Sequence, residues 1–222
     1  MKSYDAISGH DKSAEVYDDQ AAEYDWLCSE ALFGLTYEYV KPGQSLLDIG
    51  IGTGLSSILF HKAGLRVYGL DGSRAMLKVC ESKGFASGLK QHDIRQQPLP
   101  YADDSFDHVI SIAVFNFIGE LGPIFEEVAR IIRDGGIFGF MVFELKTGGQ
   151  DGRASYTGDD IAEVVDEEWE AKMFRHSDEY VSRLLRDNGF AVLRDHRFAA
   201  LKRPSSDEVV ILKLFIARKG KP

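Results

Sequence analysis

At 222 residues, with 44% hydrophobic and 27% charged residues, the sequence has the length and composition of one globular α/β domain with a substantial core. Its formal net charge of −9 argues against binding to nucleic acid or to anionic membrane surfaces, because both interactions depend on Lys and Arg. The most apolar stretches, 109–115 and 137–143, are shorter than the ~18–20 residues of a membrane span, so we expect a cytoplasmic protein without membrane association.

In chain order, the first forty residues predict two helices, at 11–24 and 26–40, and Pro42-Gly43 ends the second. From residue 45 onward, short β-type runs alternate with helical patterns. The predicted strands are 45–49, 66–70, 86–91, 106–112 and 137–143, and the predicted helices are 55–63, 74–83 and 121–133. Such alternation predicts an α/β fold with a mostly parallel sheet and helices on both of its faces.

The end of the chain has a different pattern. A helix is predicted at 177–188, followed by strands at 190–200 and 207–217 with no helix between them. We interpret these two strands as an antiparallel hairpin that closes one edge of a seven-stranded sheet.

The segment that ends at Gly54 reads Leu-Leu-Asp-Ile-Gly-Ile-Gly-Thr-Gly and is the most specific motif. Asp48 ends a buried strand, and glycines at the alternate positions 50, 52 and 54 allow a tight turn and a close approach of a ligand to the backbone. A dinucleotide fingerprint starting at Gly50 would require glycine where the sequence has Leu55, and no P-loop Lys-Ser/Thr follows. The loop therefore predicts a nucleoside site of another kind.

The pattern Asp-x-Gly-x-Gly-x-Gly resembles the first motif of class I S-adenosylmethionine-dependent methyltransferases. The resemblance covers about residues 14–218, with the specific motifs between 45 and 112, and the hairpin-closed sheet agrees with the Rossmann-like fold of that family. It implies that the backbone of Gly50 and Gly52 passes beneath the methionine part of S-adenosylmethionine, while Asp48 supports the loop or holds the amino group. Ile51 and Gly54, in the same loop, are included in the predicted cofactor site.

Further cofactor residues are expected just beyond the later strands, where open parallel sheets bind ligands. Asp71 stands 21 residues after Gly50 and is placed to accept hydrogen bonds from a ribose diol. The resemblance implies that Asp93 accepts a hydrogen bond from the adenine amino group and that Ile94 packs on the ring. The remaining predicted cofactor residues are Tyr24, Gly72, Ser73, Met76, Ser111 and Ala113.

The resemblance implies methyl transfer, an in-line displacement that needs neither a metal nor a covalent nucleophile. The sequence has no cluster of His and Cys typical of a metal site and no Gly-x-Ser-x-Gly elbow. After the fourth strand it also lacks the Asn-Pro-Pro-Tyr type of motif found in enzymes that methylate base or amide nitrogens. We therefore expect a small-molecule acceptor, with N, O or C as the acceptor atom, S-adenosylhomocysteine as product, and a monomer or homodimer.

We expect a single domain over 1–222, consisting of N-terminal helices (1–44), a cofactor-binding core (45–143), a lid or substrate insertion (144–176), and the final helix with the hairpin (177–222). The insertion carries seven acidic residues between Asp159 and Glu170, without Lys or Arg. This charge selects a cationic or amine acceptor in one hypothesis. In the other hypothesis, which we favour, the acidic residues form the solvated face of an amphipathic helix, because apolar residues recur at helical spacing. These residues are Ile161, Val164, Val165 and Trp169. A strand over 169–174 remains a further interpretation.

One histidine is a candidate general base. The stretch Phe174-Arg-His-Ser177 resembles a segment of bacterial predicted methyltransferases related to those with tetratricopeptide repeats, in which an Arg-x-His-Ser pattern leads into the final helix. Here Arg175 directly precedes His176, a small departure from that spacing, and an imidazole suits proton transfer near neutral pH. Ser177 is an equally good N-cap, so His176 is alternatively a residue that merely precedes a helix. The other histidines show no comparable constellation: His10, His61, His92, His108 and His196.

Four other functions are considered at this point. The fold could bind S-adenosylmethionine as a non-catalytic sensor or scaffold, or it could methylate a protein. RNA methylation is weakened by the acidic charge, and a nicotinamide-dependent oxidoreductase is disfavoured by Leu55.

Overall fold

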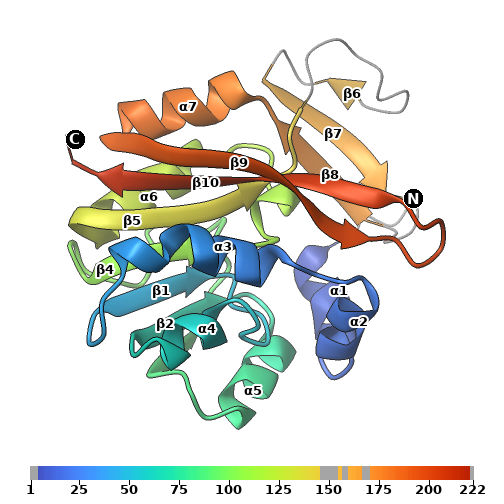
Figure 1. Cartoon of the computed structure of the whole chain (residues 1–222), viewed down its shortest axis with the longest axis horizontal. Helices are drawn as coiled ribbons and strands as arrows, with labels where there is room; N and C mark the ends of the chain where they lie inside the picture. Colours follow the sequence, from blue (N-terminus) through green and yellow to red (C-terminus); the bar gives the residue numbers. More distant parts are fainter. Residues whose placement is uncertain (1–4, 146–154, 157–159, 167–170, 221–222) are drawn as a thin grey trace.

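The computed structural model describes residues 5–145, 155–156, 160–166 and 171–220. Its central feature is a seven-stranded sheet with the order β3-β2-β1-β4-β5-β10-β9 (Figure 1). The strands are β1 (Ser45–Ile49), β2 (Arg66–Asp71), β3 (Gly88–Gln91), β4 (Phe106–Ser111), β5 (Ile132–Val142), β9 (Phe190–Lys202) and β10 (Val209–Lys219). Strands β1 to β5 pair in parallel, whereas β10 pairs antiparallel with both β5 and β9. The predicted mostly parallel sheet with a closing hairpin is confirmed.

β1 occupies the middle of the parallel part and is buried along its whole length. It pairs with β2 on one side and with β4 on the other, so the direction in which the chain adds strands reverses beside β1. Parallel sheets open a crevice at such a reversal, beyond the carboxyl ends of the strands. The position of the glycine motif at the end of β1 is therefore a consequence of topology.

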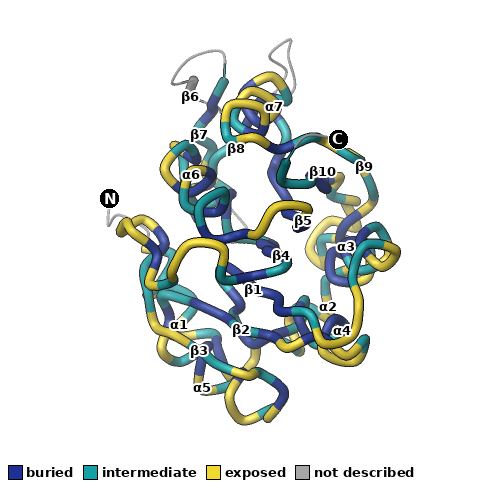
Figure 2. Tube along the Cα trace, turned by 90° about the vertical axis from the view of Figure 1, so that its left-hand side faces the viewer, coloured by how far each residue is buried: buried dark blue, intermediate teal, exposed yellow. Residues whose placement is uncertain are grey.

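Helices cover both faces of the sheet. One face packs on α6 (Gly122–Ile131) and α7 (Asp178–Asp187), through Phe125, Val128 and Leu185. The other packs on α3 (Cys28–Thr36), α4 (Ser57–Lys62) and α5 (Arg74–Ser82), through Leu32, Phe60 and Cys80. Figure 2 shows the result, with the central strands mostly buried and the outer sides of the helices exposed.

The N-terminal segment differs from its prediction. The single helix expected at 11–24 is wrong, because α1 (Ala6–Ser13) begins earlier and a turn separates it from α2 (Tyr17–Glu23). Asp5 caps α1 by accepting a hydrogen bond from the Ser8 backbone N–H at 3.2 Å. The second predicted helix, 26–40, is α3 followed by one 3₁₀ turn, η1 (Tyr37–Tyr39). Figure 1 shows α1 and α2 lying beyond the carboxyl ends of the parallel strands.

Carboxylates anchor these two helices to the core at separate places. Asp11 of α1 accepts hydrogen bonds from the Ser73 hydroxyl at 2.6 Å and from the backbone N–H of Ala75 at 3.2 Å. Asp18 of α2 accepts a hydrogen bond from the Thr53 hydroxyl at 2.6 Å and pairs with the Lys83 ammonium at 2.5 Å. The two carboxylates therefore bind different segments of the core, and each helix is docked by its own contacts.

The insertion also differs from its prediction. Ile161 to Asp166 form strand β7, which pairs antiparallel with β8 (Ala171–His176) and with β6 (Ser155–Tyr156), so the favoured amphipathic helix is wrong for the residues described here. The strand interpretation of 169–174 is correct for its described part. β-Branched side chains at 161, 164 and 165 suit a strand, and the β7–β8 hydrogen-bond ladder outweighs a helical spacing that spans only two turns. Trp169 lies outside the described residues.

Two boundaries shift as well. The predicted helix 121–133 ends at Ile131, and β5 begins at Ile132 rather than at Ile137, with an irregularity in its pairing with β4. Within the described ranges, every helix is too short or too polar to traverse a lipid bilayer.

Candidate functional site

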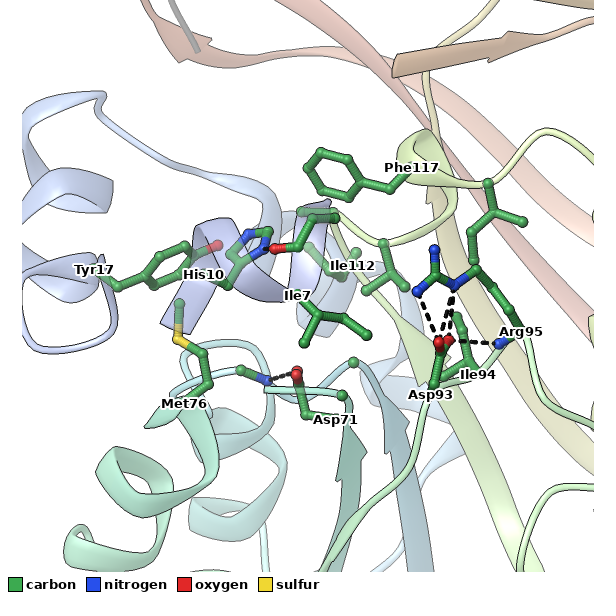
Figure 3. Close-up of a pocket in the computed structure, with 17 residues that line it drawn as sticks. Ile7, His10, Tyr17, Asp71, Met76, Asp93, Ile94, Arg95, Ile112 and Phe117 are labelled. Atoms are coloured by element: carbon green, nitrogen blue, oxygen red, sulfur yellow. Dashed lines mark hydrogen bonds and ion pairs between the residues drawn. The ribbon is translucent and has the colours of Figure 1, made fainter. Parts of the chain in front are cut away.

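A crevice of about 110 Å³ lies beyond the carboxyl ends of the parallel strands, between them and α1 (Figure 3). Residues that follow β1, β2, β3 and β4 line it, as does α1. Eight of the predicted cofactor residues come together there: Gly50, Gly52, Asp71, Gly72, Met76, Asp93, Ile94 and Ala113.

The glycine loop presents bare backbone to this crevice. Gly50 has a φ of +75°, and a Cβ built on it would lie 2.2 Å from a Val114 methyl, so both the backbone conformation and the packing require glycine. Gly52 has a φ of +54°, but a Cβ there would meet no described atom within 4 Å. Since Gly52 lines the crevice, the space beside it is available to a ligand.

Asp71 connects the ends of β1 and β2. One of its carboxylate oxygens accepts a hydrogen bond from the Gly52 backbone N–H at 2.8 Å, and the other accepts one from the Ser73 backbone N–H at 2.8 Å. Burial raises the pKa of Asp71, while these two backbone hydrogen bonds act in the opposite direction. Each oxygen keeps a further lone pair for a ligand hydroxyl. Asp71 therefore holds the glycine loop in place and offers acceptors to the crevice.

Asp93 lies on the opposite wall and pairs with Arg95. The Arg95 guanidinium donates to both carboxylate oxygens, at 2.9 Å from Nε and 2.7 Å from Nη2, and this pairing lowers the pKa of Asp93. Arg95 also lines the crevice, a feature the sequence analysis did not identify. Figure 3 shows Asp71, Met76 and Asp93 around the crevice, with Ile7 of α1 lying among them.

Asp48 supports the loop from beneath and does not line the crevice. It is 1% exposed, and its carboxylate accepts a hydrogen bond from the Ser57 hydroxyl at the start of α4. Burial raises the pKa of Asp48 to about 7, which the Ser57 hydrogen bond opposes and the nearby Asp71 charge reinforces. Of the two roles predicted for Asp48, support of the loop agrees with this geometry.

Four other predicted residues have structural contacts behind the crevice wall. The Ile51 side chain packs against Gly69, and Gly54, with a φ of +89°, lies against the ring of Phe85. Ser73 caps α5 by accepting from the Met76 backbone N–H at 3.1 Å. The Ser111 hydroxyl donates to the Ile49 carbonyl at 2.9 Å and so joins β4 to β1. None of these four lines the crevice, so their predicted contact with a cofactor is not supported by their side-chain positions.

A second cavity, of about 410 Å³, adjoins the first. Four residues line both cavities: His10, Tyr17, Ala113 and Phe117. Ala113 has a φ of +58°, an unfavourable conformation for a residue with a Cβ, and such strain is typical of functional sites. Tyr24, predicted to reach the cofactor, lines the second cavity and not the crevice.

The walls of the second cavity are largely apolar and come from distant parts of the chain. Its aromatic and apolar lining includes Trp26, Phe143, Ala171, Met173 and Leu201. β8 of the insertion contributes two of these residues. Asn116 is 3% exposed and lines the same cavity, and its carbonyl oxygen Oδ1 has no hydrogen-bond partner among the described residues. A buried acceptor without a partner is costly, so Asn116 is suited to receive a ligand N–H or O–H.

His176 lines neither cavity, and its position does not support the general-base role predicted for it. It is fully buried, and its Nε2 lies 3.0 Å from the Ile118 carbonyl oxygen and 2.9 Å from that of Gly119, so Nε2 carries the proton and donates a hydrogen bond to these oxygens. Burial lowers the pKa of His176. The following Ser177 caps α7, accepting from the Tyr180 backbone N–H at 3.1 Å. His176 therefore joins β8 to the segment after β4, in agreement with the structural alternative.

Three of the acidic residues in the insertion have basic partners. Asp160 pairs with Arg183 at 2.6 Å and Glu163 with Lys172 at 2.6 Å, and Asp166 pairs with Arg203. The hypothesis that this charge selects a cationic acceptor is not supported by these residues, while Asp159 and Glu170 lie outside the described ranges.

The sequence analysis missed the contribution of α1 and α2 to the crevice. Ile7 of α1 packs directly on Gly72, since a Cβ on that glycine would lie 2.5 Å from the Ile7 side chain, and His10 and Tyr17 line both cavities. The sequence does contain a signal for α1. Asp5 is a suitable N-cap, and Ile7 and His10 lie three residues apart, on one face of the helix that follows.

Comparison with known proteins identifies relatives of the core. Residues 47–140 match the family model described as a methyltransferase domain. The chain is 34% identical over 133 residues to malonyl-[acyl-carrier protein] O-methyltransferase of Serratia marcescens, covering 60% of this chain and 50% of that protein. It is 35% identical over 136 residues to demethylmenaquinone methyltransferase of Renibacterium salmoninarum, covering 57% and 56% respectively. The chain thus spans about half the length of the curated relatives it matches.

Solved structures share the fold. A methyltransferase from Methanosarcina mazei superposes with a TM-score of 0.69 at 19% identity, covering 85% of this chain and 98% of that one. Magnesium protoporphyrin IX methyltransferase of Synechocystis PCC 6803, solved with bound S-adenosylmethionine, superposes with a TM-score of 0.61 at 18% identity, covering 96% and 81%.

Proposed function

We propose that this chain, whose core belongs to the class I S-adenosylmethionine-dependent methyltransferases, transfers a methyl group from S-adenosylmethionine to a small acceptor with a planar, largely apolar body. The observation that carries this proposal is the pair of adjoining cavities whose common wall is His10, Tyr17, Ala113 and Phe117. A cofactor in the crevice and an acceptor in the second cavity would face each other across these residues.

The residues of the crevice fit the cofactor. The open side of Gly52 leaves room for the methionine part beside bare backbone, and Asp71 has lone pairs available for the ribose hydroxyls. Met76 and Ile94 offer apolar surfaces to the adenine ring, and Asp93 offers an acceptor that it shares with Arg95. When bound, the cofactor supplies a methyl group on a positively charged sulfur, which a nucleophile takes in an in-line displacement.

The remaining lining residues position the acceptor and exclude water. Ile112, Val114 and Ile118 make the inner wall of the crevice apolar, which favours a reaction that disperses charge. The aromatic lining of the second cavity favours a flat ring, and Asn116 provides one directional contact for its polar group. One relative is named for a quinone, demethylmenaquinone, which is consistent with this acceptor class but does not assign it to this chain.

Calorimetry tests the cofactor part of the proposal. We expect S-adenosylhomocysteine to bind and NAD not to bind, and Asp71→Ala to lower the affinity for S-adenosylhomocysteine at least ~10-fold, because a site left with unpaired polar groups loses binding free energy. Asp71→Asn, which keeps one acceptor, should lose less. Asp187→Ala, at an exposed carboxylate at the end of α7, is the matched control. Binding of NAD in place of S-adenosylhomocysteine would contradict the assignment.

A screen for transfer of labelled methyl tests the acceptor part. Phenols, catechols, hydroquinones and aryl amines form the panel. Turnover of one or more of them supports the proposal. Tight binding of S-adenosylhomocysteine with no transfer to any panel member favours the sensor or scaffold alternative.

A further inference from the structure

His10 lies where the two cavities meet. It is in the last turn of α1, it is partly buried, and it lines both cavities. Its ring contacts two aromatic rings, with centroid distances of 6.0 Å to Tyr17 and 5.5 Å to Phe117, and it meets the Phe117 ring edge to face at 84°. These contacts hold the imidazole at the common wall (Figure 3).

A backbone hydrogen bond sets the tautomer of this imidazole. Nδ1 lies 2.7 Å from the carbonyl oxygen of Ala6, one helical turn earlier. A carbonyl oxygen can only accept, so Nδ1 carries the proton in the neutral ring and Nε2 presents a lone pair. Nε2 has no hydrogen-bond partner among the described residues. The arrangement is the reverse of that at His176, where Nε2 itself donates to backbone carbonyls.

Among the four residues of the common wall, only His10 has a ring nitrogen whose lone pair can accept a proton. Ala113 and Phe117 have no titratable group. Burial raises the pKa of Tyr17 to about 12, with a further contribution from the Asp71 charge, so its phenol stays protonated. The carboxylates of Asp71, at the end of β2, and of Asp11, on the same helix, both interact electrostatically with His10.

We propose that His10 is the catalytic base of this enzyme, and that its Nε2 accepts the proton that the methyl acceptor loses. The proposal rests on the proposed function and names a residue for it. The acceptor's O–H or N–H bond breaks and an N–H bond forms at Nε2. The electron pair of the acceptor atom then forms a bond to the methyl carbon, while the carbon–sulfur bond breaks and its two bonding electrons stay on sulfur. The products are the methylated acceptor, neutral S-adenosylhomocysteine and protonated His10, which returns its proton to water.

The first test needs no acceptor. Nitrogen-15 NMR of the histidine side chains, with and without S-adenosylhomocysteine, reports which ring nitrogen carries the proton. We expect the neutral ring of His10 to carry its proton on Nδ1 and that of His176 to carry its proton on Nε2. His10→Gln identifies the His10 signals by their loss. A proton on Nε2 of His10 in both samples would overturn the proposal.

The second test uses a panel compound that the wild-type protein methylates. His10→Gln should lower kcat at least ~100-fold with little change in KM, and should abolish the acid limb of the pH profile of kcat/KM. Its affinity for S-adenosylhomocysteine and its melting temperature should stay close to those of wild type. His196→Gln, which removes an exposed histidine of β9, is the control and should keep full activity.

The two tests separate the failure of this inference from that of the proposed function. Wild-type turnover with unchanged kcat and pH profile in His10→Gln overturns the role of His10 and leaves the methyltransferase assignment intact. If the wild type methylates no panel compound, the proposed acceptor class fails, and the NMR result still decides whether Nε2 of His10 is available as a base.

Discussion

The glycines after β1 have different reasons to be glycine, although they are spaced evenly in the sequence. All three have positive φ values, which disfavour any side chain. A Cβ on Gly54 would lie 2.5 Å from the Phe85 ring and 3.0 Å from the Cys80 sulfur, inside the core, whereas a Cβ on Gly52 would meet no described atom within 4 Å. Core packing therefore requires glycine at position 54. At position 52 glycine leaves the adjacent part of the crevice free for a ligand.

Substitution by alanine separates these two reasons. Gly52→Ala should lower the affinity for S-adenosylhomocysteine at least ~10-fold, because its methyl group enters the crevice, while its stability falls by about 1–2 kcal/mol from the backbone conformation alone. Gly54→Ala carries the same backbone cost plus a clash in the core, so it should lower the melting temperature further. Calorimetry and thermal melts of both variants measure this. Equal losses of affinity at equal stability would contradict the distinction.

At the level of elements, β8 shows how the insertion takes part in the site. Its residues alternate between the cavity and solvent: Ala171 and Met173 are 1% and 2% exposed and line the second cavity, while Lys172 is exposed and pairs with Glu163. No described residue of the insertion lines the crevice. The insertion should therefore affect the acceptor and not the cofactor.

A pair of substitutions in β8 tests this division. Ala171→Leu extends a larger side chain into the cavity and should reduce methylation of the bulkier panel compounds at least ~10-fold, with unchanged affinity for S-adenosylhomocysteine. Lys172→Leu places the same side chain on the opposite face, where loss of an exposed ion pair costs only about 0–1 kcal/mol, and should leave both properties unchanged. Steady-state rates and calorimetry check the prediction, and a loss of cofactor affinity in Ala171→Leu would contradict it.

At the level of the whole molecule, a buried carboxyl beneath the site couples stability to pH. The pKa of Asp48 is raised to about 7 in the folded protein, whereas an aspartate in an unfolded chain titrates near ~3.9. Between these values the folded protein holds a proton that the unfolded chain has released. The contribution of Asp48 to the free energy of unfolding therefore falls as pH rises from about 4 to about 7, and is constant above that range.

Asp48→Asn removes this titration. Its melting temperature relative to wild type should increase from pH 5 to pH 8, because the wild type must hold a buried charge at the higher pH and the amide oxygen can still accept from Ser57. Asp107→Asn is the opposite control. Burial favours the neutral form of Asp107, but hydrogen bonds from Ser45 and Arg133 prevail and hold its pKa at about 2, so Asp107→Asn should be less stable than wild type at pH 8. A difference for Asp48→Asn that is constant with pH would refute the assignment of a raised pKa.

Patterns in the sequence are enough to predict the alternating strands, the closing hairpin and the residues beyond β1, β2 and β3 that meet in the crevice. These features are local or periodic: a buried parallel strand is an apolar run, a tight turn needs glycine, and carboxyl ends of parallel strands meet at one edge whatever the loops do. The side chains of Asp71 and Asp93 could therefore be placed at the crevice without coordinates.

Contacts between distant parts of the chain determine the features that these patterns do not predict, namely the strand over 161–166 and the positions of two histidines. Residues 161–166 have apolar side chains at helical spacing, yet pairing with β8 makes them a strand, because the backbone partner lies outside any local window. The two histidines make the same point. His176 precedes a helix in a suggestive motif and is bound by two carbonyls from the segment after β4, whereas His10, which no motif marks, reaches the common wall because Asp11 anchors α1 across the crevice. Long-range packing, which no periodicity encodes, determines which of the two histidines lies at the cavities.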